Sequence, residues 1–441
     1  MIERDSSQAD PGERELGQVF TPDDVAQQIA GMLDFESSGR ARILDAGAGH
    51  GALSEAVAAR SAELGPRPSF VLVELDPVLA NGIVEDCRRW AAPSDATFTV
   101  ISGDFILYSP PPDGLFSHIV MNPPYLRVAA GSAQQSLLRA AKIAAPNLYG
   151  AFLWHAVAML QHDGEMVAIV PRSFFSGVQF RRLRHHLLDS LAIETIRGFE
   201  RRDVLFARDG VLQEVVIVKF KKSPPAAHVV IEWSMADGSL SARRAAYEVV
   251  VESGVDRRIR LLGHDEEVVD RKSWRPLIDD SLSVRTGEVV DFRTPEVSSD
   301  AGIDCVPLID SRYEPLLRSI RPRGGPRYLP RSHAAVHPPG TYVVVSRFSP
   351  IERRPRIRAA VVPEERTTVW GGIAFENHVN YISGRGKQQL TAELAEWLLS
   401  VLTHPDIEAQ FRQVSGSTQV NLSDIATLLV PPELEAQRPG V

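Results

Sequence analysis

The sequence predicts an α/β protein with a doubly wound, mostly parallel sheet, followed by a second, mixed α+β domain. Short apolar runs alternate with helical segments from residue 21 to about residue 220, several runs end in a polar side chain, and the alternation stops after Lys222-Ser-Pro-Pro. Strands separated by helices form parallel sheets, which bind ligands at the carboxyl ends of their strands. We therefore expect domains at residues 1–235 and 236–441, and we expect residues 1–15, which are polar and acidic, to be disordered.

Hydrophobic periodicity places the individual elements. Thr21 and Pro22 are a helix-start signal, with Thr21 as the expected N-cap. Helices are expected at 23–33, 53–64, 77–90, 149–160 and 180–191, and in the second domain at 391–403 and 405–414. Strands are expected at 42–45, 70–74, 97–101, 117–121, 165–171, 195–199 and 214–220.

Charge and composition limit the class of protein. The formal net charge is −8, from 48 basic and 56 acidic residues, which argues weakly against a nucleic-acid partner. However, the stretch from Arg312 to Arg366 holds twelve arginines and four acids, or +8, so one face can still bind a polyanion. There is no apolar stretch of membrane-spanning length, and two cysteines in 441 residues fit a reducing cytosol and exclude a disulfide scaffold. We expect no metal site.

A glycine-rich segment opens the predicted cofactor crevice. Asp45-Ala-Gly-Ala-Gly-His-Gly follows the first strand, and its glycines, which include Gly47 and Gly49, allow close backbone approach to a ligand. Their spacing differs from the dinucleotide fingerprint. Asp45 would repel a pyrophosphate but attract the amino group of a methionine moiety, although a tight structural turn is the alternative. Glu74 and Asp104, at the next two strand ends, can accept from ribose hydroxyls and an adenine amine, which predicts a nucleoside-bearing cofactor.

A second motif follows the fourth strand and is the predicted catalytic loop. In Asn122-Pro123-Pro124-Tyr125, the two prolines hold the backbone extended. The Asn122 side-chain oxygen and the Pro123 carbonyl are then fixed acceptors for the two N–H groups of a planar amine. Such preorganised dipoles stabilise a transition state. Tyr125 offers a flat face on which an extruded base can stack.

Together these motifs resemble the gamma-class, amino-group DNA methyltransferases that use S-adenosylmethionine. Leu16–Pro22 resembles the amino-terminal motif of that family, and Asn147–Phe152 resembles its next helix. The resemblance implies a Rossmann-like methyltransferase sheet with a DNA-recognition domain and a flipped adenine as substrate. It implies that cofactor contacts come from Phe20, Thr21, Asp45, Gly47, Gly49, Glu74, Asp104, Phe105, Asn122 and Phe152. It also implies that an aromatic in Asp203–Phe206 contacts the flipped base, with Phe206 the candidate and Phe199 the runner-up.

Further segments are similar to the PstI/BsuBI group of restriction–modification methylases, and they span nearly the whole chain. They are Pro171–Gly177, Val211–Glu214, Arg285–Arg293 and Ser415–Asn421. The resemblance implies double-stranded DNA as the partner, a cognate restriction endonuclease, and a location in the bacterial or archaeal cytoplasm, associated with the nucleoid. The predicted function is site-specific adenine-N6 methylation within a restriction–modification or related defence system.

The DNA contacts and several alternatives stay open at this stage. Candidate DNA-binding residues are Arg323, Arg327, Arg331, Arg353, Arg354, Arg356 and Arg358, which cannot be ranked. Alternatives are cytosine-N4 methylation, which more often carries Ser in place of Asn122, methylation of RNA or of a protein amide, and a catalytically silent DNA-targeting subunit. Cytosine-C5 chemistry is excluded because neither Cys87 nor Cys305 lies in a Pro-Cys setting. The role of the loop at 126–146 is open.

Overall fold

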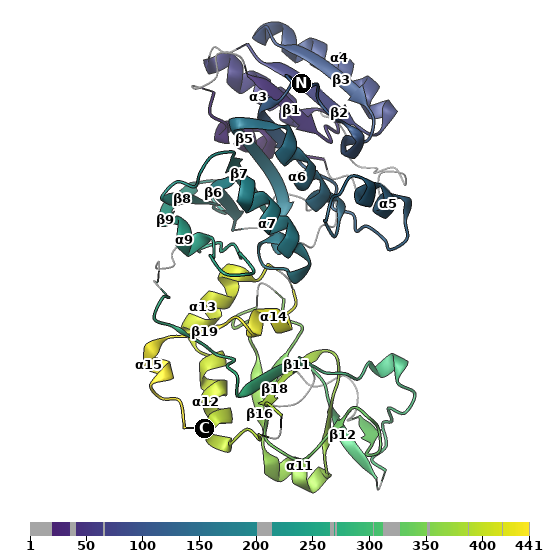
Figure 1. Cartoon of the computed structure of the whole chain (residues 1–441), viewed down its shortest axis with the longest axis vertical. Coiled ribbons are helices and arrows are strands. Elements are labelled where there is room, and N and C mark those ends of the chain that lie inside the picture. The colour runs from purple at the N-terminus through teal and green to yellow at the C-terminus, as the bar shows by residue number, and fades with distance from the viewer. Residues whose placement is uncertain are drawn as a thin grey trace. The chain divides into compact units, whose positions relative to one another are not determined.

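The computed structural model describes residues 20–35, 41–64, 67–200, 214–264, 269, 271–302, 304–311, 327–350, 353–386, 388–416 and 418–440. Tertiary contacts divide the chain into two compact units, residues 1–265 and 266–441 (Figure 1). Several sequence expectations fall outside the described residues: the disorder of residues 1–15, the start of the amino-terminal motif at 16–19, Phe206 and Arg323.

Among the described residues of the first unit, nine strands form one sheet in the order β3-β2-β1-β4-β5-β7-β6-β8-β9. The first five strands of this order are parallel, and β7 runs antiparallel to both β5 and β6. The strands are β1 (Arg42–Ala46), β2 (Ser69–Glu74), β3 (Thr97–Ser102), β4 (Phe116–Met121), β5 (Leu160–Pro171), β6 (Ala192–Phe199), β7 (Val215–Lys221), β8 (His228–Ser234) and β9 (Leu240–Ala246).

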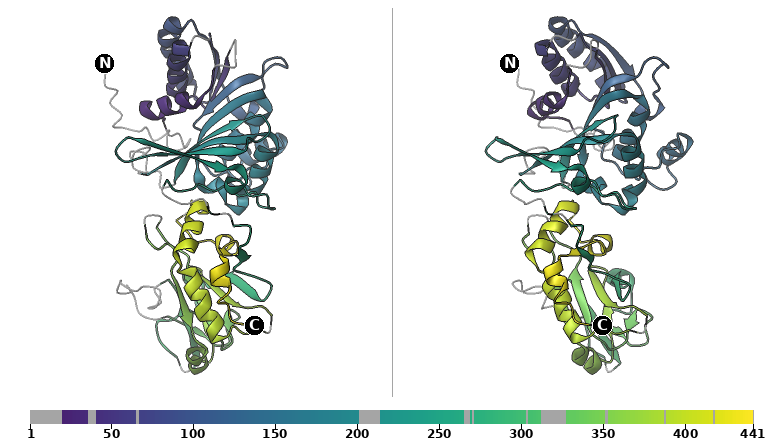
Figure 2. Two further views of the ribbon diagram at one scale, coloured as in Figure 1. Left: turned by 90° about the vertical axis from the view of Figure 1, so that its left-hand side faces the viewer. Right: turned by 60° about the vertical axis from the view of Figure 1, so that its left-hand side comes forward.

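Helices cover both faces of this sheet, as Figure 2 shows. One face packs against α2 (Asp23–Met32), α3 (Ala52–Leu64) and α4 (Pro77–Ser94). The other packs against η1 (Phe105–Leu107), α6 (Leu148–Met159) and α7 (Arg181–Ser190). The shorter elements are α5 (Ala133–Ala140), η2 (Arg172–Phe175), η3 (Val178–Phe180) and α9 (Tyr247–Val250). This double covering explains why the central strands read as continuous apolar runs.

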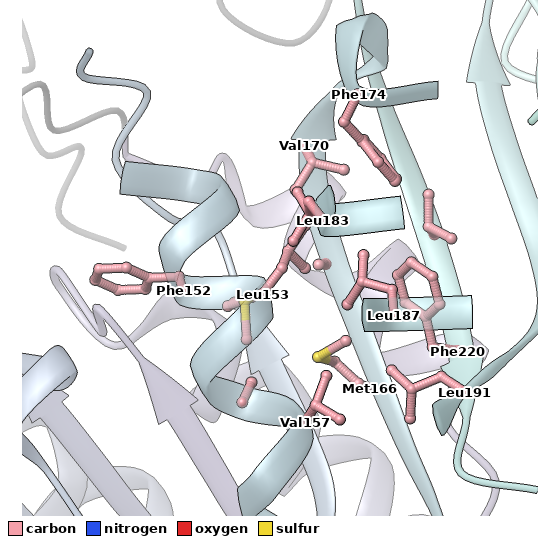
Figure 3. Packing of buried hydrophobic residues seen from close by; sticks show 14 of the residues in the cluster. Phe152, Leu153, Val157, Met166, Val170, Phe174, Leu183, Leu187, Leu191 and Phe220 are labelled. Atoms are coloured by element: carbon pink, nitrogen blue, oxygen red, sulfur yellow. The ribbon is translucent and has the colours of Figure 1, made fainter. Parts of the chain in front are cut away.

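The larger core lies between the sheet and α6 and α7 (Figure 3). Leu153 and Val157 of α6 meet Leu187 of α7 over Met166 of β5, and all four side chains are at least 95% buried. Phe174 and Phe175 are fully buried in the same core, as the sequence predicts for this aromatic pair. In Figure 3, the Phe152 ring lies on the opposite side of α6 from Leu183 and Leu187.

The boundary between the units differs from the sequence expectation at 235/236. β8 and β9 form an antiparallel hairpin that extends the first sheet, and residue 235 lies in its turn, where Met235 N donates to Ser239 O at 2.9 Å. Trp233 of β8 also donates from Nε1 to Leu262 O at 2.8 Å. The polar, glycine-containing turn resembles a linker in sequence, but its pairing keeps the chain in the first unit as far as residue 265.

The described part of the second unit contains two four-stranded sheets, β11-β18-β15-β16 and β13-β12-β17-β14, and the pair β10-β19. The strands are β10 (Arg275–Pro276), β11 (Leu282–Thr286), β12 (Cys305–Ile309), β13 (Tyr328–Pro330), β14 (Val336–His337), β15 (Tyr342–Ser346), β16 (Ala359–Val362), β17 (Ile373–Phe375), β18 (Val379–Gly384) and β19 (Leu429–Val430). The helices are η4 (Asp291–Arg293), α11 (Glu364–Trp370), α12 (Ala392–Leu402), α13 (Pro405–Val414), α14 (Leu422–Ile425) and α15 (Pro432–Glu435). A core of aliphatic and aromatic side chains joins α12 and α13 to the β11-β18-β15-β16 sheet. This is the mixed α+β arrangement that the sequence predicts.

Candidate functional site

The glycine turn lies at the carboxyl end of β1, between β2 and β4 in the sheet. Gly47, Gly49 and Gly51 all have positive φ angles, of 75°, 56° and 80°. A Cβ atom at Gly47 would lie 3.3 Å from the ring of Phe152, and one at Gly49 would lie 3.4 Å from the ring of Phe20. The positive φ angles strain any other side chain at all three positions, and at Gly47 a Cβ would also crowd the Phe152 ring, so the turn needs glycine.

Glu74, the predicted ribose ligand, ends β2 next to this turn and is buried. Its Oε2 accepts a hydrogen bond from Gly49 N at 2.8 Å, and its Oε1 accepts one from Asp76 N at 3.0 Å. The carboxylate therefore ties the glycine turn to the start of α4. Each carboxylate oxygen accepts more than one hydrogen bond, so this anchoring is compatible with a ligand hydroxyl as a further donor.

Asp45 lies beneath the turn and is fully buried. Ser54 of α3 donates its hydroxyl to Asp45 Oδ2 at 2.7 Å, whereas Oδ1 has no hydrogen-bond partner among the described residues. Burial raises the pKa of this carboxyl to about 7, an effect that the Ser54 hydrogen bonds partly oppose. An unpartnered, buried carboxylate oxygen is stabilised by a nearby cation or proton. Sequence spacing carries no signal for the Ser54 contact.

Aromatic rings and a third acid complete this side of the crevice. Asp104 follows β3 and accepts from Ile106 N at 2.9 Å, which caps the short helix η1. Phe105 packs on Phe152 of α6 with ring centroids 4.8 Å apart. Phe20 packs on His50 of the glycine turn at 4.3 Å, a contact that the sequence analysis did not anticipate.

The Asn-Pro-Pro-Tyr loop leaves the carboxyl end of β4, the strand next to β1. Asn122 Nδ2 donates to Thr21 Oγ1 at 3.0 Å, and Tyr125 OH donates to Asn122 Oδ1 at 3.1 Å. Thr21 was expected to cap α2, but the N-cap is Pro22, which has no side-chain oxygen to accept from the helix. The Thr21 hydroxyl instead joins the amino-terminal motif to the Asn-Pro-Pro-Tyr loop, and the two hydrogen bonds orient the Asn122 amide.

Tyr125 is held by aromatic packing. Its ring meets Tyr149 of α6 edge-on at 6.2 Å, and the Tyr149 hydroxyl is 3.0 Å from Ser173 Oγ. Burial raises the pKa of the Tyr125 phenol above its ordinary value, so the hydroxyl stays protonated and remains a donor to Asn122. Phe199, the runner-up for the base contact, is 9% exposed at the end of β6. The loop at 126–146 contains the helix α5, which the sequence did not predict.

The described candidate arginines of the second unit differ in their exposure. Arg331 and Arg354 are exposed, and Arg327, Arg353 and Arg358 are partly buried. Arg327 pairs with Asp291 and Arg331 with Asp304. Arg356 is fully buried, and its guanidinium donates to the carbonyls of Ser349 and Ser415, both at 3.3 Å. Burial of Arg356 is at odds with its expected DNA contact and gives it a structural role.

The residues around the glycine turn fit S-adenosylmethionine. Acids lie at the ends of three adjacent parallel strands, the positive φ angles of the turn disfavour side chains, and two aromatic rings flank it. The unpartnered Asp45 oxygen suits the positive charge of the methionine end. Among the described residues there is no cluster of three or more His, Cys, Asp or Glu side chains arranged for a metal, and no described helix is long and apolar enough to cross a bilayer.

Sheet order and turn together define the class of protein. A parallel sheet in the order β3-β2-β1-β4-β5, extended by an antiparallel β7 inserted before β6, is the sheet of class I S-adenosylmethionine-dependent methyltransferases. The solved structure of the type IIG restriction endonuclease BpuSI shares the fold. It is 14% identical in sequence, with a TM-score of 0.51, and the match covers 95% of this chain and 59% of that one.

Sequence comparison places the chain within a family. The type II methyltransferase M.BsuBI of Bacillus subtilis is 32% identical over 95% of this chain and 88% of its own length. M.PstI of Providencia stuartii is 31% identical over 94% of this chain and 87% of its own length. Residues 93–206 match the model of the Eco57I restriction-modification methylase family. The chain belongs to the family of type II restriction–modification methyltransferases.

Proposed function

We propose that this protein methylates the exocyclic N6 amine of adenine at a specific sequence in double-stranded DNA. The observation that carries the proposal is the orientation of Asn122, whose amide is held between Thr21 and Tyr125 at the edge of the sheet that also bears the glycine turn. The family supports DNA as the substrate, because the similar proteins are type II methyltransferases.

In the proposed mechanism, the target adenine leaves the duplex and stacks on Tyr125. The hydrogen bond from Asn122 Nδ2 to Thr21 orients the amide, and the Tyr125 hydroxyl uses only one lone pair of Asn122 Oδ1. The second lone pair of Oδ1 is one acceptor for the amine, and the Pro123 carbonyl is the other. Together they bind the two N–H groups of the amine and increase the electron density on nitrogen. Fixed dipoles of this kind contribute about 3–4 kcal/mol to transition-state stabilisation.

S-Adenosylmethionine, when bound, supplies an electrophilic methyl group on a sulfonium. The residues that would hold it are those around the glycine turn, with Glu74 near the ribose, Asp104 and Phe105 near the adenine, and Asp45 toward the methionine amine. Phe20 and Phe152 would shape the two sides of the pocket, since their rings already lie 3.4 and 3.3 Å from the Cβ positions of the glycines. Transfer is direct and needs no covalent enzyme intermediate.

The second unit is proposed to recognise the target sequence, and Phe206 is proposed to contact the flipped base. Cytosine-N4 methylation is the nearest alternative, and Asn rather than Ser at position 122 favours adenine. A cognate restriction endonuclease remains part of the proposal, since residues 93–206 match a family described as restriction-modification methylases.

Labelling of candidate substrates tests the proposal. Purified protein is incubated with S-adenosylmethionine tritiated in the methyl group and, separately, with duplex DNA, tRNA and a protein lysate. We expect label in DNA, recovered as N6-methyladenine after digestion. Label only in tRNA or protein, or recovery as N4-methylcytosine, would overturn the proposed substrate. Long-read sequencing of DNA from cells that express the protein then gives the modified sequence.

A further inference from the structure

Three segments of the second unit, far apart in sequence, meet at one end of the β11-β18-β15-β16 sheet. They are residues 347–349 after β15, residues 377–378 before β18, and residues 418–420. Arg347 N donates to His378 O at 2.8 Å, Val420 N donates to Arg347 O at 2.8 Å, and Ser349 N donates to Thr418 O at 2.9 Å. Main-chain hydrogen bonds therefore make this sheet end a continuous, ordered edge.

Three side chains on this edge are exposed to solvent, although the main chain beneath them is hydrogen-bonded. Phe348 is 53% exposed, the His378 side chain is 60% exposed, and Gln419 is also exposed. Arg347 is partly buried beside them, and its guanidinium donates to Gln419 Oε1 at 3.4 Å. We call these four residues the edge patch. An exposed aromatic ring among fixed polar groups is typical of a binding surface.

Buried groups hold the edge patch in place. The Arg347 guanidinium also donates to Asn377 O at 3.1 Å. Beneath His378, the buried Glu376 carboxylate accepts from the His378 main-chain N at 2.9 Å and lies 2.7 Å from its Nδ1. The ring orientation is thus fixed, with Nε2 directed away from the carboxylate. Side chains that are already ordered lose less entropy on binding.

Arg356 and Arg358, two of the candidate DNA-binding arginines, donate hydrogen bonds to main-chain carbonyls of the segments that form this edge. The Arg356 guanidinium joins the carbonyls of Ser349 and Ser415, and it lies 4.9 Å from the centre of the Phe411 ring. Arg358 donates to the Phe348 carbonyl at 3.4 Å. Burial of Arg356 follows from this task, because it holds the segment after Phe348 beside the segment that leads to residue 419.

We propose that the edge patch reads base edges of duplex DNA, an inference that rests on the proposed function. An arginine fork matches the two acceptors of guanine, a glutamine amide matches adenine, and Phe348 can contact a thymine methyl group. Of the five arginines between residues 347 and 358, all but the buried Arg356 are at least partly exposed, and with one glutamate in this stretch they give it the positive charge that phosphates require. Arg347, Phe348, His378 and Gln419 are therefore specificity-determining residues.

The test uses the full chain, with the modified sequence first identified by long-read sequencing. Methyl transfer is measured on a duplex with that sequence and on duplexes with each base pair changed in turn. We expect Arg347→Ala and Gln419→Ala to lower kcat/KM on the first duplex about 10- to 100-fold and to reduce discrimination at one position each. Arg385→Ala is the matched control, since Arg385 is exposed after the opposite end of β18 and the variant should keep both rate and discrimination.

Arg347→Lys separates base reading from phosphate binding, because lysine keeps the charge but loses the fork. We expect Arg347→Lys to lose discrimination as Arg347→Ala does, while the Tm and the affinity for unrelated DNA stay near those of the unaltered protein. Full recovery of discrimination by lysine, or unchanged discrimination in both alanine variants, would overturn base reading by the edge patch. Unaltered protein that labels no DNA would overturn the proposed function itself.

Discussion

Thr21→Val tests whether the amino-terminal motif orients the Asn122 amide, the proposed catalytic group. The variant keeps the shape of the side chain but removes the hydroxyl that accepts from Asn122 Nδ2 at 3.0 Å. A single hydrogen bond of this kind is worth about 0.5–1.5 kcal/mol net, so the rate of methyl transfer should fall about 2- to 12-fold. The decrease should be in the rate of the chemical step, because without this hydrogen bond the Asn122 amide is correctly oriented for a smaller fraction of the time.

The assay is single-turnover transfer of tritiated methyl to duplex DNA, with cofactor affinity measured separately by equilibrium dialysis. Thr99→Val, on the exposed side of β3, is the matched control and should leave both quantities unchanged. The resemblance to known methyltransferases assigns Thr21 a different task, contact with the methionine end of the cofactor. A normal single-turnover rate combined with weaker cofactor binding would support that task and refute the orientation of Asn122 by Thr21.

Three further predictions address the Asn122 amide, the buried Asp45 carboxyl and the glycine turn. Asn122→Ala should lower methyl transfer at least about 10²-fold while dialysis shows that cofactor binding persists; loss of both would mean that Asn122 acts mainly in folding. Burial raises the pKa of Asp45 to about 7, so the folded protein holds this proton more tightly than the unfolded chain and loses stability as pH rises from about 4 to 7. Asp45→Asn cannot ionise and should not show that loss. The Tm of the variant minus the Tm of the parent protein should therefore be larger at about pH 8 than at about pH 5, and an equal Tm difference at both pH values would contradict the burial argument. Gly47→Ala adds a Cβ at a φ of 75° and 3.3 Å from the Phe152 ring, and it should weaken cofactor binding about tenfold or more; unchanged affinity would show that the turn does not shape the pocket.

The sequence predicts the first unit well because its signals are local. Alternation of apolar runs and helical periods places β1 to β7 and the helices around them, with most boundaries within a few residues of those observed. Strand ends follow from the same pattern, so the positions of Asp45, Glu74 and Asn122 on one edge of the sheet were also predictable. Helix α13 was predicted at Pro405–Val414, where the structure has it.

Prediction failed where pairing partners lie far apart or where local signals compete. The hairpin of β8 and β9 was not recognised because its turn has the composition of a linker, and only pairing of β8 with β6 attaches it to the sheet. Thr21 has the residue type of a helix cap, yet its hydroxyl contacts Asn122, which is 101 positions later in the chain. Contacts between residues so far apart cannot be predicted from sequence spacing.

Residue identity and spacing alone determined the class of chemistry: a glycine turn after one strand, acids after the next two and Asn122-Pro-Pro-Tyr after the fourth. Each of these motifs consists of residues that are neighbours in the sequence, and each follows directly from one predicted strand end. Only the tertiary structure decided which arginines are available to a partner. Arg356 and Arg347 look alike in a basic stretch of sequence, but folding buries Arg356 against two carbonyls and places Arg347 beside Gln419. Burial and hydrogen bonding depend on which distant segments meet, and charge patterning along the chain does not contain that information.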